Sequence, residues 1–256
     1  LGYTNLVPTK IVNTVYLETG SDDALADFDG DGLAELSIGR IPARTTQDVS
    51  NALAKVQAFE QPAMQDLSRG AIFAYDLPNG YDFQGMSATL RNNLPGSMPA
   101  VMIGRGDVNS QTTLINEINN GRYIVNYSGH GSTGIWATAS FFGIASVPAL
   151  TNVNNQSIFT MLTCLNGYFI NPYGDSLAES LLKAQTGGAV ASWASTGLTT
   201  PDIQLIMANR FYSQIAAGNI TRMGDLVRDA KAQIPAGSDV RFSWVLIGDP
   251  MLKVRQ

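Results

Sequence analysis

Short, apolar, β-prone segments alternate with segments of helical periodicity along most of this chain, and that alternation is the strongest constraint on its fold. The strands are predicted at residues 69–75, 99–103, 123–127, 157–163, 189–193 and 244–247, and the helices at 45–59, 82–93, 111–119, 176–184, 201–217 and 223–232. Thr46 is the expected N-cap of the first helix. Strands that alternate with helices form mostly parallel sheets with helices on both faces, so an α/β fold is predicted. Propensity alone does not select its topology.

Length and composition limit the classes of protein to which this chain can belong. Its 256 residues suffice for one sizeable core, and α/β folds of this length are often a single domain. A hydrophobic fraction of 45% and a charged fraction of 14% are typical of a globular protein. The net charge of -5 and the lack of any Lys/Arg run argue against a nucleic-acid partner. No apolar run approaches the roughly eighteen residues of a membrane-spanning helix, so no transmembrane segment is predicted.

The single histidine and the single cysteine both follow predicted strands. His130 lies in a Ser-Gly-His-Gly turn after strand 123–127, and Cys164 directly follows strand 157–163. Open α/β sheets place their chemistry at the carboxyl edge of the strands. Only the thiolate form of cysteine is strongly nucleophilic, and a nearby imidazole can generate it. The pattern is equally compatible with a catalytic pair and with a buried structural cysteine beside a hydrogen-bonded turn histidine.

The segments around these two residues resemble the gingipain-type cysteine peptidases of the caspase-like clan. The similar segments are Asn-Tyr-Ser-Gly-His-Gly-Ser at 126–132, Leu-Thr-Cys-Leu-Asn-Gly at 162–167, Asp-Phe-Asp-Gly-Asp-Gly at 27–32 running into Ile-Gly-Arg-Ile-Pro at 38–42, Trp-Ala-Ser-Thr at 193–196, and Ile-Gly-Asp-Pro at 247–250. They span almost the whole chain in the family's order. The resemblance implies a caspase-like three-layer α/β sandwich, with a single catalytic domain over residues 1–256.

The resemblance also implies a larger protein. Residues 1–4 contain no initiator methionine, basic region or apolar core of a signal peptide, which indicates an internal or processed segment. Relatives in the family carry another strand-rich portion before this point, so we expect further domains in the same polypeptide. Family membership also implies secretion or exposure at the cell surface.

Acyl transfer is the chemistry that the resemblance implies. In a cysteine endopeptidase of this type, His130 activates Cys164, whose thiolate attacks a peptide carbonyl, and water then hydrolyses the thioacyl-enzyme. The backbone N–H groups of Gly131 and Cys164 are the implied oxyanion donors. A glycine after the histidine leaves room for the approaching substrate, which is a protein or a peptide. No cofactor is required for this chemistry.

Two aspartates are candidates for supporting roles. Asp76 ends the predicted strand 69–75, where the resemblance implies an acidic residue that orients His130, although turn aspartates are also common at such positions. Asp82 matches the family's aspartate at the base of the pocket for an arginine or lysine side chain before the cleaved bond. A helix N-cap is the alternative role of Asp82. The implied walls of the pocket are Trp193, Ser195 and Thr196.

The most acidic stretch matches the first half of a calcium-binding loop. Asp27, Asp29 and Asp31 alternate along the chain, and Gly32 follows them. Oxygen ligands at alternate positions and a glycine at the sharp turn are features of such loops. The twelfth position of the loop is Ile38, which cannot supply a bidentate carboxylate. A structural calcium ion and a solvated acidic turn therefore both remain open.

Other chemistries fit the sequence less well. A zinc site would combine one histidine and one cysteine with carboxylates only, an unusual ligand set for zinc. A serine hydrolase that used Ser128 or Ser132 would lack the Gly-x-Ser-x-Gly elbow. Some members of the family act as transpeptidases in protein secretion. In such an enzyme the same dyad forms the thioacyl-enzyme, and an amine attacks it in place of water. A non-catalytic binding module is the remaining alternative, and the presence of both His130 and Cys164 argues against it.

Overall fold

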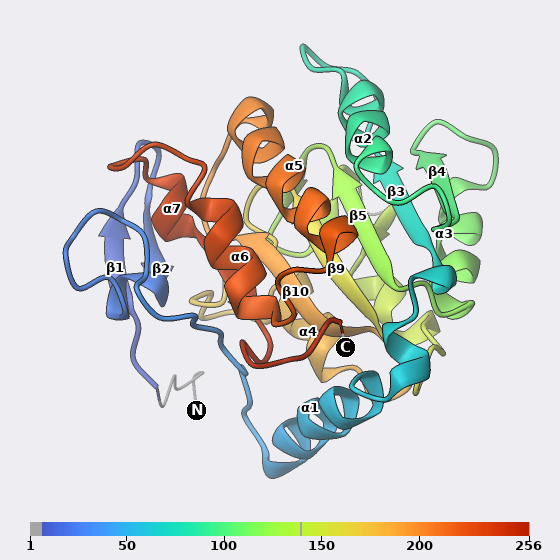
Figure 1. Cartoon of the computed structure of the whole chain (residues 1–256), viewed down its shortest axis with the longest axis horizontal. Helices are drawn as coiled ribbons and strands as arrows, with labels where there is room; N and C mark the ends of the chain where they lie inside the picture. Colours follow the sequence, from blue (N-terminus) through green and yellow to red (C-terminus); the bar gives the residue numbers. More distant parts are fainter. Residues whose placement is uncertain (1–6, 139, 256) are drawn as a thin grey trace.

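A six-stranded sheet forms the centre of the computed structural model, which describes residues 7–138 and 140–255 (Figure 1). Its strand order is β11-β10-β9-β5-β3-β4, and every neighbouring pair is parallel except β10 and β11. The strands are β3 (Ala71–Tyr75), β4 (Ala100–Gly104), β5 (Ile124–Ser128), β9 (Ser157–Leu162), β10 (Ala189–Ser195) and β11 (Trp244–Ile247). The predicted mostly parallel sheet is therefore confirmed.

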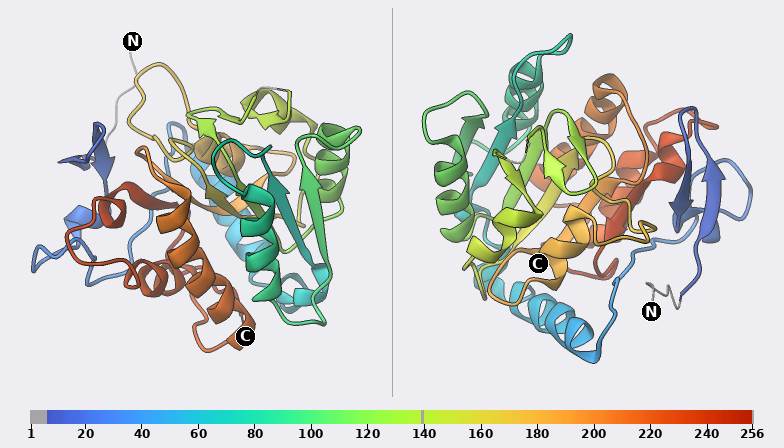
Figure 2. Two further views of the ribbon diagram at one scale, coloured as in Figure 1. Left: turned by 90° about the horizontal axis from the view of Figure 1, so that it is seen from above. Right: turned by 180° about the vertical axis from the view of Figure 1, so that it is seen from behind.

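Helices cover both faces of this sheet. In Figure 1, α2 (Phe83–Asn92), α5 (Pro201–Ala217) and α6 (Met223–Lys231) lie on the face toward the viewer. The view from behind in Figure 2 shows α3 (Ser110–Asn119) and α4 (Leu177–Lys183) on the other face. Helix α1 (Thr46–Phe59) runs past the lower ends of the strands in Figure 1. Each face buries its own apolar cluster, and the result is three layers.

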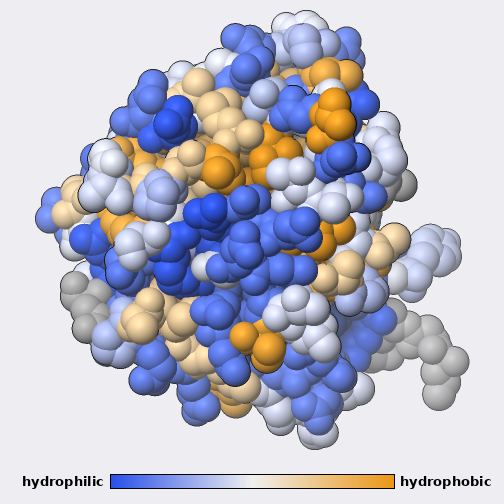
Figure 3. All heavy atoms as spheres, turned by 90° about the vertical axis from the view of Figure 1, so that its right-hand side faces the viewer, coloured by the Kyte–Doolittle hydropathy of each residue, from blue (hydrophilic) through white to orange (hydrophobic). Residues whose placement is uncertain are grey.

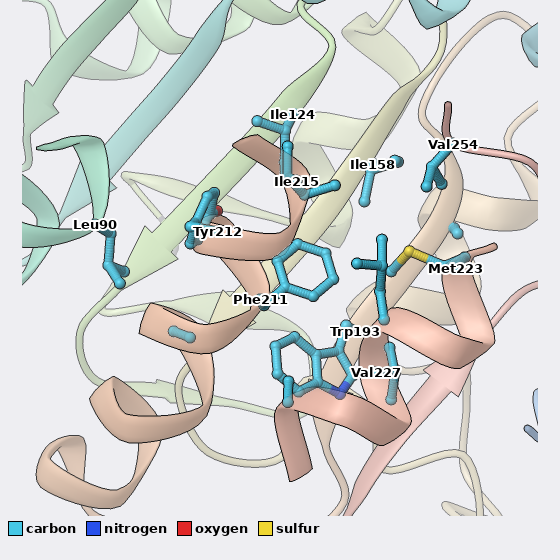
Figure 4. Packing of buried hydrophobic residues seen from close by; sticks show 14 of the residues in the cluster. Leu90, Ile124, Ile158, Trp193, Phe211, Tyr212, Ile215, Met223, Val227 and Val254 are labelled. Atoms are coloured by element: carbon cyan, nitrogen blue, oxygen red, sulfur yellow. The ribbon is translucent and has the colours of Figure 1, made fainter. Parts of the chain in front are cut away.

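The central strands are buried from both sides, which explains why apolar residues predominate in them without a strict alternation. Every residue of β5, β9 and β10 is buried. Figure 4 shows Trp193 of β10 packed under the helices of the front face. Its ring centroid lies 5.1 Å from that of Phe211 and 6.0 Å from that of Trp244. Aromatic pairs of this kind add about 0.5–1.5 kcal/mol beyond the burial of their area.

The helix starts follow local capping chemistry. Thr45 caps α1, because its hydroxyl accepts a hydrogen bond from Asp48 N (3.1 Å) while the Asp48 carboxylate accepts one from Thr45 N (2.9 Å). The prediction of Thr46 as the cap is therefore wrong by one residue, since only Thr45 has an acidic partner three positions later. Asp82 caps α2 by accepting from Gly85 N at 2.8 Å, and Pro201 is the first residue of α5.

Smaller elements surround the sheet. A hairpin of β1 (Lys10–Asn13) and β2 (Glu18–Ser21) lies beside α7 (Val240–Ser243). Between β5 and β9 the chain forms a three-stranded sheet of β6 (Gly131–Ser132), β7 (Ile135–Trp136) and β8 (Phe142–Gly143). The 3-10 helices are η1 (Asp23–Leu25), η2 (Pro62–Gln65), η3 (Leu67–Arg69) and η4 (Ile144–Ala149). The predicted processed start at residues 1–4 lies outside the described residues.

The face of the molecule that carries α3 and the β4 edge is mainly hydrophilic (Figure 3). Figure 3 shows the side of the molecule that carries α3 and the β4 edge, where hydrophilic side chains dominate the centre and apolar ones form small separate groups. Among the described residues, no helix combines the length and the apolar character needed to cross a bilayer.

Candidate active site

The parallel register of β5 and β9 brings the histidine and the cysteine to one place. Ser128 pairs with Leu162 at the ends of the two strands, and His130 and Cys164 each lie two residues further along. The pairing continues as Gly129 N donates to Leu162 O at 3.2 Å. Because adjacent strands are about 5 Å apart, the two side chains leave the carboxyl edge from matching positions on neighbouring strands.

Cys164 is half-buried and faces the start of α5. The backbone N–H of Thr199 donates to the Cys164 sulfur at 3.5 Å, and the sulfur lies 3.7 Å from the Thr199 carbonyl oxygen. Thr199 immediately precedes the N-cap of the 17-residue helix α5. The thiol can therefore donate to one backbone group of Thr199 and accept from the other, which holds the sulfur against the segment that leads into α5.

The His130 ring is exposed at the same edge and is held by neighbours from α2 and the loop before it. Phe83 packs against it edge-on, with ring centroids 5.3 Å apart at 79°. Asn79 Nδ2 lies 3.5 Å from His130 Nε2. No sequence motif points to Asn79, and its contact with the ring follows from the folding of the loop between β3 and α2.

The side chain of Tyr127 fixes the main chain of His130. Tyr127 donates its hydroxyl to the His130 carbonyl oxygen at 2.6 Å, and its ring stacks on Trp136 with centroids 4.4 Å apart. Burial, followed by the nearby charge of Asp76, raises the pKa of Tyr127 above its usual value. The phenol therefore remains protonated and continues to donate this hydrogen bond.

Asp76 lies buried directly after β3 and reaches the same loop. One carboxylate oxygen accepts from Arg105 Nε at 2.5 Å and from Leu77 N at 2.7 Å. The other oxygen accepts from the backbone N–H of His130 at 3.3 Å. The contact between Asp76 and His130 thus involves the main chain, whereas the sequence led us to expect the ring.

Gly131 is required where the histidine loop approaches β9. A Cβ at this position would lie 2.5 Å from Thr163 Oγ1 and 2.9 Å from the carbonyl oxygen of Ile135. We expected a glycine here to leave room for substrate. The closest constraint is instead packing, since the turn after His130 could not approach the end of β9 with a larger residue.

A pocket of about 410 Å³ lies between α2 and the start of α5. Asp82 and Phe83 line it from α2, and Pro201 and Asp202 line it from α5. Phe83 also contacts the His130 ring, so the pocket adjoins the histidine. A hydrogen bond from the Thr200 side chain lowers the pKa of Asp202, which keeps this second carboxylate ionised near neutral pH.

A larger pocket of about 490 Å³ lies at the other edge of the sheet, away from His130 and Cys164. Its lining includes Leu67 and Pro95, which precede β3 and β4, and Ala216 near the end of α5. These residues mark the amino edge of the sheet, opposite to His130 and Cys164.

The assignment of Trp193, Ser195 and Thr196 as pocket walls is corrected by their burial. All three are 0% exposed. Trp193 belongs to the aromatic core described above. Ser195 Oγ donates to Gly197 O at 3.0 Å, and Thr196 Oγ1 donates to Gly20 O at 3.0 Å. Side chains without accessible surface cannot contact a substrate, so their roles in this structure are to pack and to fix loops.

The acidic loop brings together four carboxylates. The ligand atoms of Asp27, Asp29, Asp31 and Glu35 all lie within 4.8 Å of one another. Calcium binds oxygen at about 2.3–2.6 Å, so oxygens at this mutual spacing can all reach a single ion. Glu35 occupies the ninth position of the loop and not the twelfth, where such loops carry their bidentate carboxylate. Arg241 Nη1 also pairs with Asp31 at 2.9 Å.

Comparison with known protein families gives a match over nearly the whole chain. Residues 2–255 match the model of Peptidase family C25. The chain is 32% identical over 156 residues to Gingipain R2 and to Gingipain R1 of Porphyromonas gingivalis, in alignments that cover 56% of this chain. These alignments span only 21% of the length of Gingipain R2 and 15% of Gingipain R1.

Solved structures share the fold. The crystal structure of the Arg-specific cysteine proteinase gingipain R has a TM-score of 0.86 and 23% identity, over 97% of this chain and 62% of that one. A structure described as that of a protease has a TM-score of 0.76 and 15% identity, over 94% of this chain and 60% of the other. The predicted caspase-like α/β sandwich is therefore confirmed.

Proposed function

This chain belongs to peptidase family C25, whose members are cysteine-type peptidases, and we propose that it is a cysteine endopeptidase with Cys164 as nucleophile and His130 as general base and acid. The observation that carries the proposal is the register of β5 and β9, because His130 and Cys164 each lie two residues beyond the paired ends of these adjacent strands. The Thr199 N–H donates to the sulfur and fixes its position at this edge of the sheet.

The proposed reaction proceeds through a thioacyl-enzyme. The Cys164 sulfur bonds to the substrate carbonyl carbon as His130 accepts the thiol proton, and His130 then protonates the leaving amine as the peptide bond breaks. Water next attacks the thioester carbonyl as His130 accepts its proton. The carbon–sulfur bond then breaks, the carboxylic acid product leaves, and His130 returns the proton to the Cys164 sulfur. The backbone N–H groups of Gly131 and Cys164 are the proposed donors to the oxyanion.

Asp76 is proposed to orient His130 through the main chain. Its carboxylate accepts the His130 N–H, and Arg105 balances the buried negative charge. A carboxylate held by a cation and by two backbone amides is a rigid support, because each oxygen has a defined partner.

We propose that the pocket beside His130 takes an arginine or lysine side chain from the residue before the cleaved bond. Tyr81 and Leu205, whose side chains are accessible, offer apolar surface for the aliphatic stem, and Asp82 and Asp202 offer negative charge for its end. Gingipain R, the structural relative, is described as Arg-specific. Asp82 also caps α2 through Gly85, a role that uses one of its two oxygens and leaves the other for a ligand.

The acidic loop is proposed to bind a structural calcium ion through Asp27, Asp29, Asp31 and Glu35. Such an ion would hold the loop in shape and takes no part in the proposed chemistry. Since the alignments span a minor part of the gingipains, we also propose that residues 1–256 are the catalytic domain of a longer secreted or cell-surface polypeptide.

Hydrolysis of short peptides that carry a fluorogenic amide after arginine or lysine tests the proposal. Activity is expected in the wild type and is expected to fall to background in Cys164→Ala and in His130→Ala. Product analysis in the presence of an added amine separates hydrolysis from transpeptidation, because transfer would yield the amide of the added amine. Hydrolysis that survives in Cys164→Ala would contradict the assignment of the nucleophile.

A further inference from the structure

A single buried amide connects the cysteine loop to the hairpin that follows the histidine. Asn166 lies two residues after Cys164 and is 0% exposed. Its Nδ2 donates to the carbonyl oxygens of Ser132 at 2.5 Å and Ile135 at 3.3 Å. Ser132 and Ile135 face each other in the β6–β7 hairpin, which begins directly after His130.

The backbone around Asn166 is held in one unusual conformation. Leu165 has a φ of 60°, in the left-handed region that non-glycine residues rarely adopt. Leu165 N donates to Gly197 O at 3.1 Å, and Gly167 N donates to Ser195 O at 2.8 Å. These bonds tie the turn after Cys164 to the end of β10, so the Asn166 side chain is presented to the hairpin by a fixed main chain.

We propose that Asn166 is a positioning residue that sets the place of His130 relative to Cys164. The inference rests on the proposed peptidase function and names a residue that determines the geometry of its dyad. One amide nitrogen supplies two donors to two carbonyl oxygens, which neither a carboxylate nor an aliphatic side chain can do. Asn166 Oδ1 is buried without a hydrogen-bond partner among the described residues, so donation by Nδ2 is the polar function of this side chain.

Other contacts keep the hairpin attached when this amide is removed. Leu177 N donates to Thr133 O at 2.8 Å, and Gly131 packs against Thr163. Loss of the Asn166 bonds is therefore expected to shift the hairpin and the adjoining His130 without releasing them. A shift of about 1 Å in a catalytic group can lower the rate by about 100-fold.

Asn152 provides a matched control for the loss of a buried asparagine. It is 1% exposed, and its Nδ2 donates to Gly188 O at 3.1 Å and Asn155 O at 3.4 Å. Gly188 immediately precedes β10, so Asn152 lies at the amino edge of the sheet, away from the dyad. Asn152 Oδ1 also accepts from Gly188 N at 2.7 Å, so Asn152→Ala removes at least as many buried hydrogen bonds as Asn166→Ala, at the opposite edge of the sheet.

The experiment compares hydrolysis and thiol alkylation in Asn166→Ala, the near-isosteric Asn166→Asp and Asn152→Ala. We expect both Asn166 variants to lose about 100-fold in kcat with KM changed by less than about threefold, and Asn152→Ala to keep wild-type kcat despite a similar fall in Tm. Iodoacetamide should alkylate Cys164 more slowly at pH 7 in both Asn166 variants, approaching the rate in His130→Ala.

The two readouts separate the inference from the function on which it rests. A wild-type protein without Cys164-dependent hydrolysis would overturn the proposed function, while the alkylation rates would still measure the coupling of His130 to Cys164. Wild-type alkylation rates in both Asn166 variants would overturn the inference. An equal loss of kcat in Asn152→Ala would also overturn it, since the effect would then follow from lost stability alone.

Discussion

The carboxylate of Asp76 accepts the backbone N–H of His130 at 3.3 Å, while Arg105 holds its other oxygen at 2.5 Å. The buried carboxylate of Asp76 therefore contacts the main chain of His130 and not its ring. Asp76→Asn keeps an oxygen that can accept the N–H, whereas Asp76→Ala removes it. We expect kcat to fall about 10- to 100-fold in Asp76→Ala and less in Asp76→Asn, as measured by steady-state hydrolysis. Equal losses in the two variants would indicate that the charge itself, acting on the ring, is what matters.

The pocket between α2 and α5 should distinguish basic from neutral substrates. Asp82→Asn and Asp202→Asn each remove one charge from it and should each lower kcat/KM for arginyl substrates by about tenfold or more, mainly through KM. Asp66→Asn is the control, because Asp66 also caps a helical turn, by accepting from Ser68 N at 2.8 Å, but lies at the amino edge of the sheet. An arginine preference unchanged in the Asp82→Asn, Asp202→Asn double variant would exclude this pocket.

Calcium should stabilise the fold through the acidic loop. At 100 times its dissociation constant, a ligand bound only by the folded state adds about 2.7 kcal/mol to the free energy of unfolding, which is a rise in Tm of several degrees for a domain of this size. Glu35→Gln keeps an oxygen for the Phe28 N–H but removes the charge, and should abolish most of the rise. Magnesium, which prefers stricter octahedral geometry, should have a smaller effect. A Tm that does not respond to calcium would leave the loop as a solvated turn.

Lys55 should make stability rise with pH. Its amine is buried and donates to Leu181 O and Leu182 O, and burial lowers its pKa from 10.5 to about 7. Between these two values the unfolded chain binds a proton that the folded chain does not. The free energy of unfolding therefore increases across this window, by up to about 1.4 kcal/mol per pH unit from this group.

Urea denaturation at pH 7, 8 and 9 measures the contribution of Lys55. Lys55→Met should give a flatter pH dependence than the wild type, and the same change at the exposed Lys10 should leave the slope unaltered. A wild-type slope in Lys55→Met would show that the amine stays protonated when it is buried.

Much of the fold could be predicted because its strands are buried on both faces. β5, β9 and β10 are mainly apolar segments, and the helices between them are long enough to show their period. The two-residue strands β6, β7 and β8 carry no such pattern and were missed. Their position follows from tertiary contacts, such as those of Asn166 and Gly131.

The site could be predicted only where a residue follows a strand. His130 and Cys164 end apolar runs, so their common edge followed from the sequence. Asp202 opens a helix far along the chain and reaches the pocket only because α5 packs against α2, which no local pattern reveals. Trp193 was predicted to line the pocket and lies in the core instead. A tryptophan near the end of a strand is compatible with either position, so the sequence does not distinguish them.

The most direct test of the central claim is covalent trapping by a peptidyl acyloxymethyl ketone with arginine next to the reactive carbon. Mass spectrometry of the intact protein and of its peptides locates the thioether that forms as the carboxylate leaves. Our account predicts one adduct, on Cys164, that forms far more slowly in His130→Ala and is absent in Cys164→Ala. An adduct at another residue, or equal rates of labelling with and without His130, would contradict the dyad.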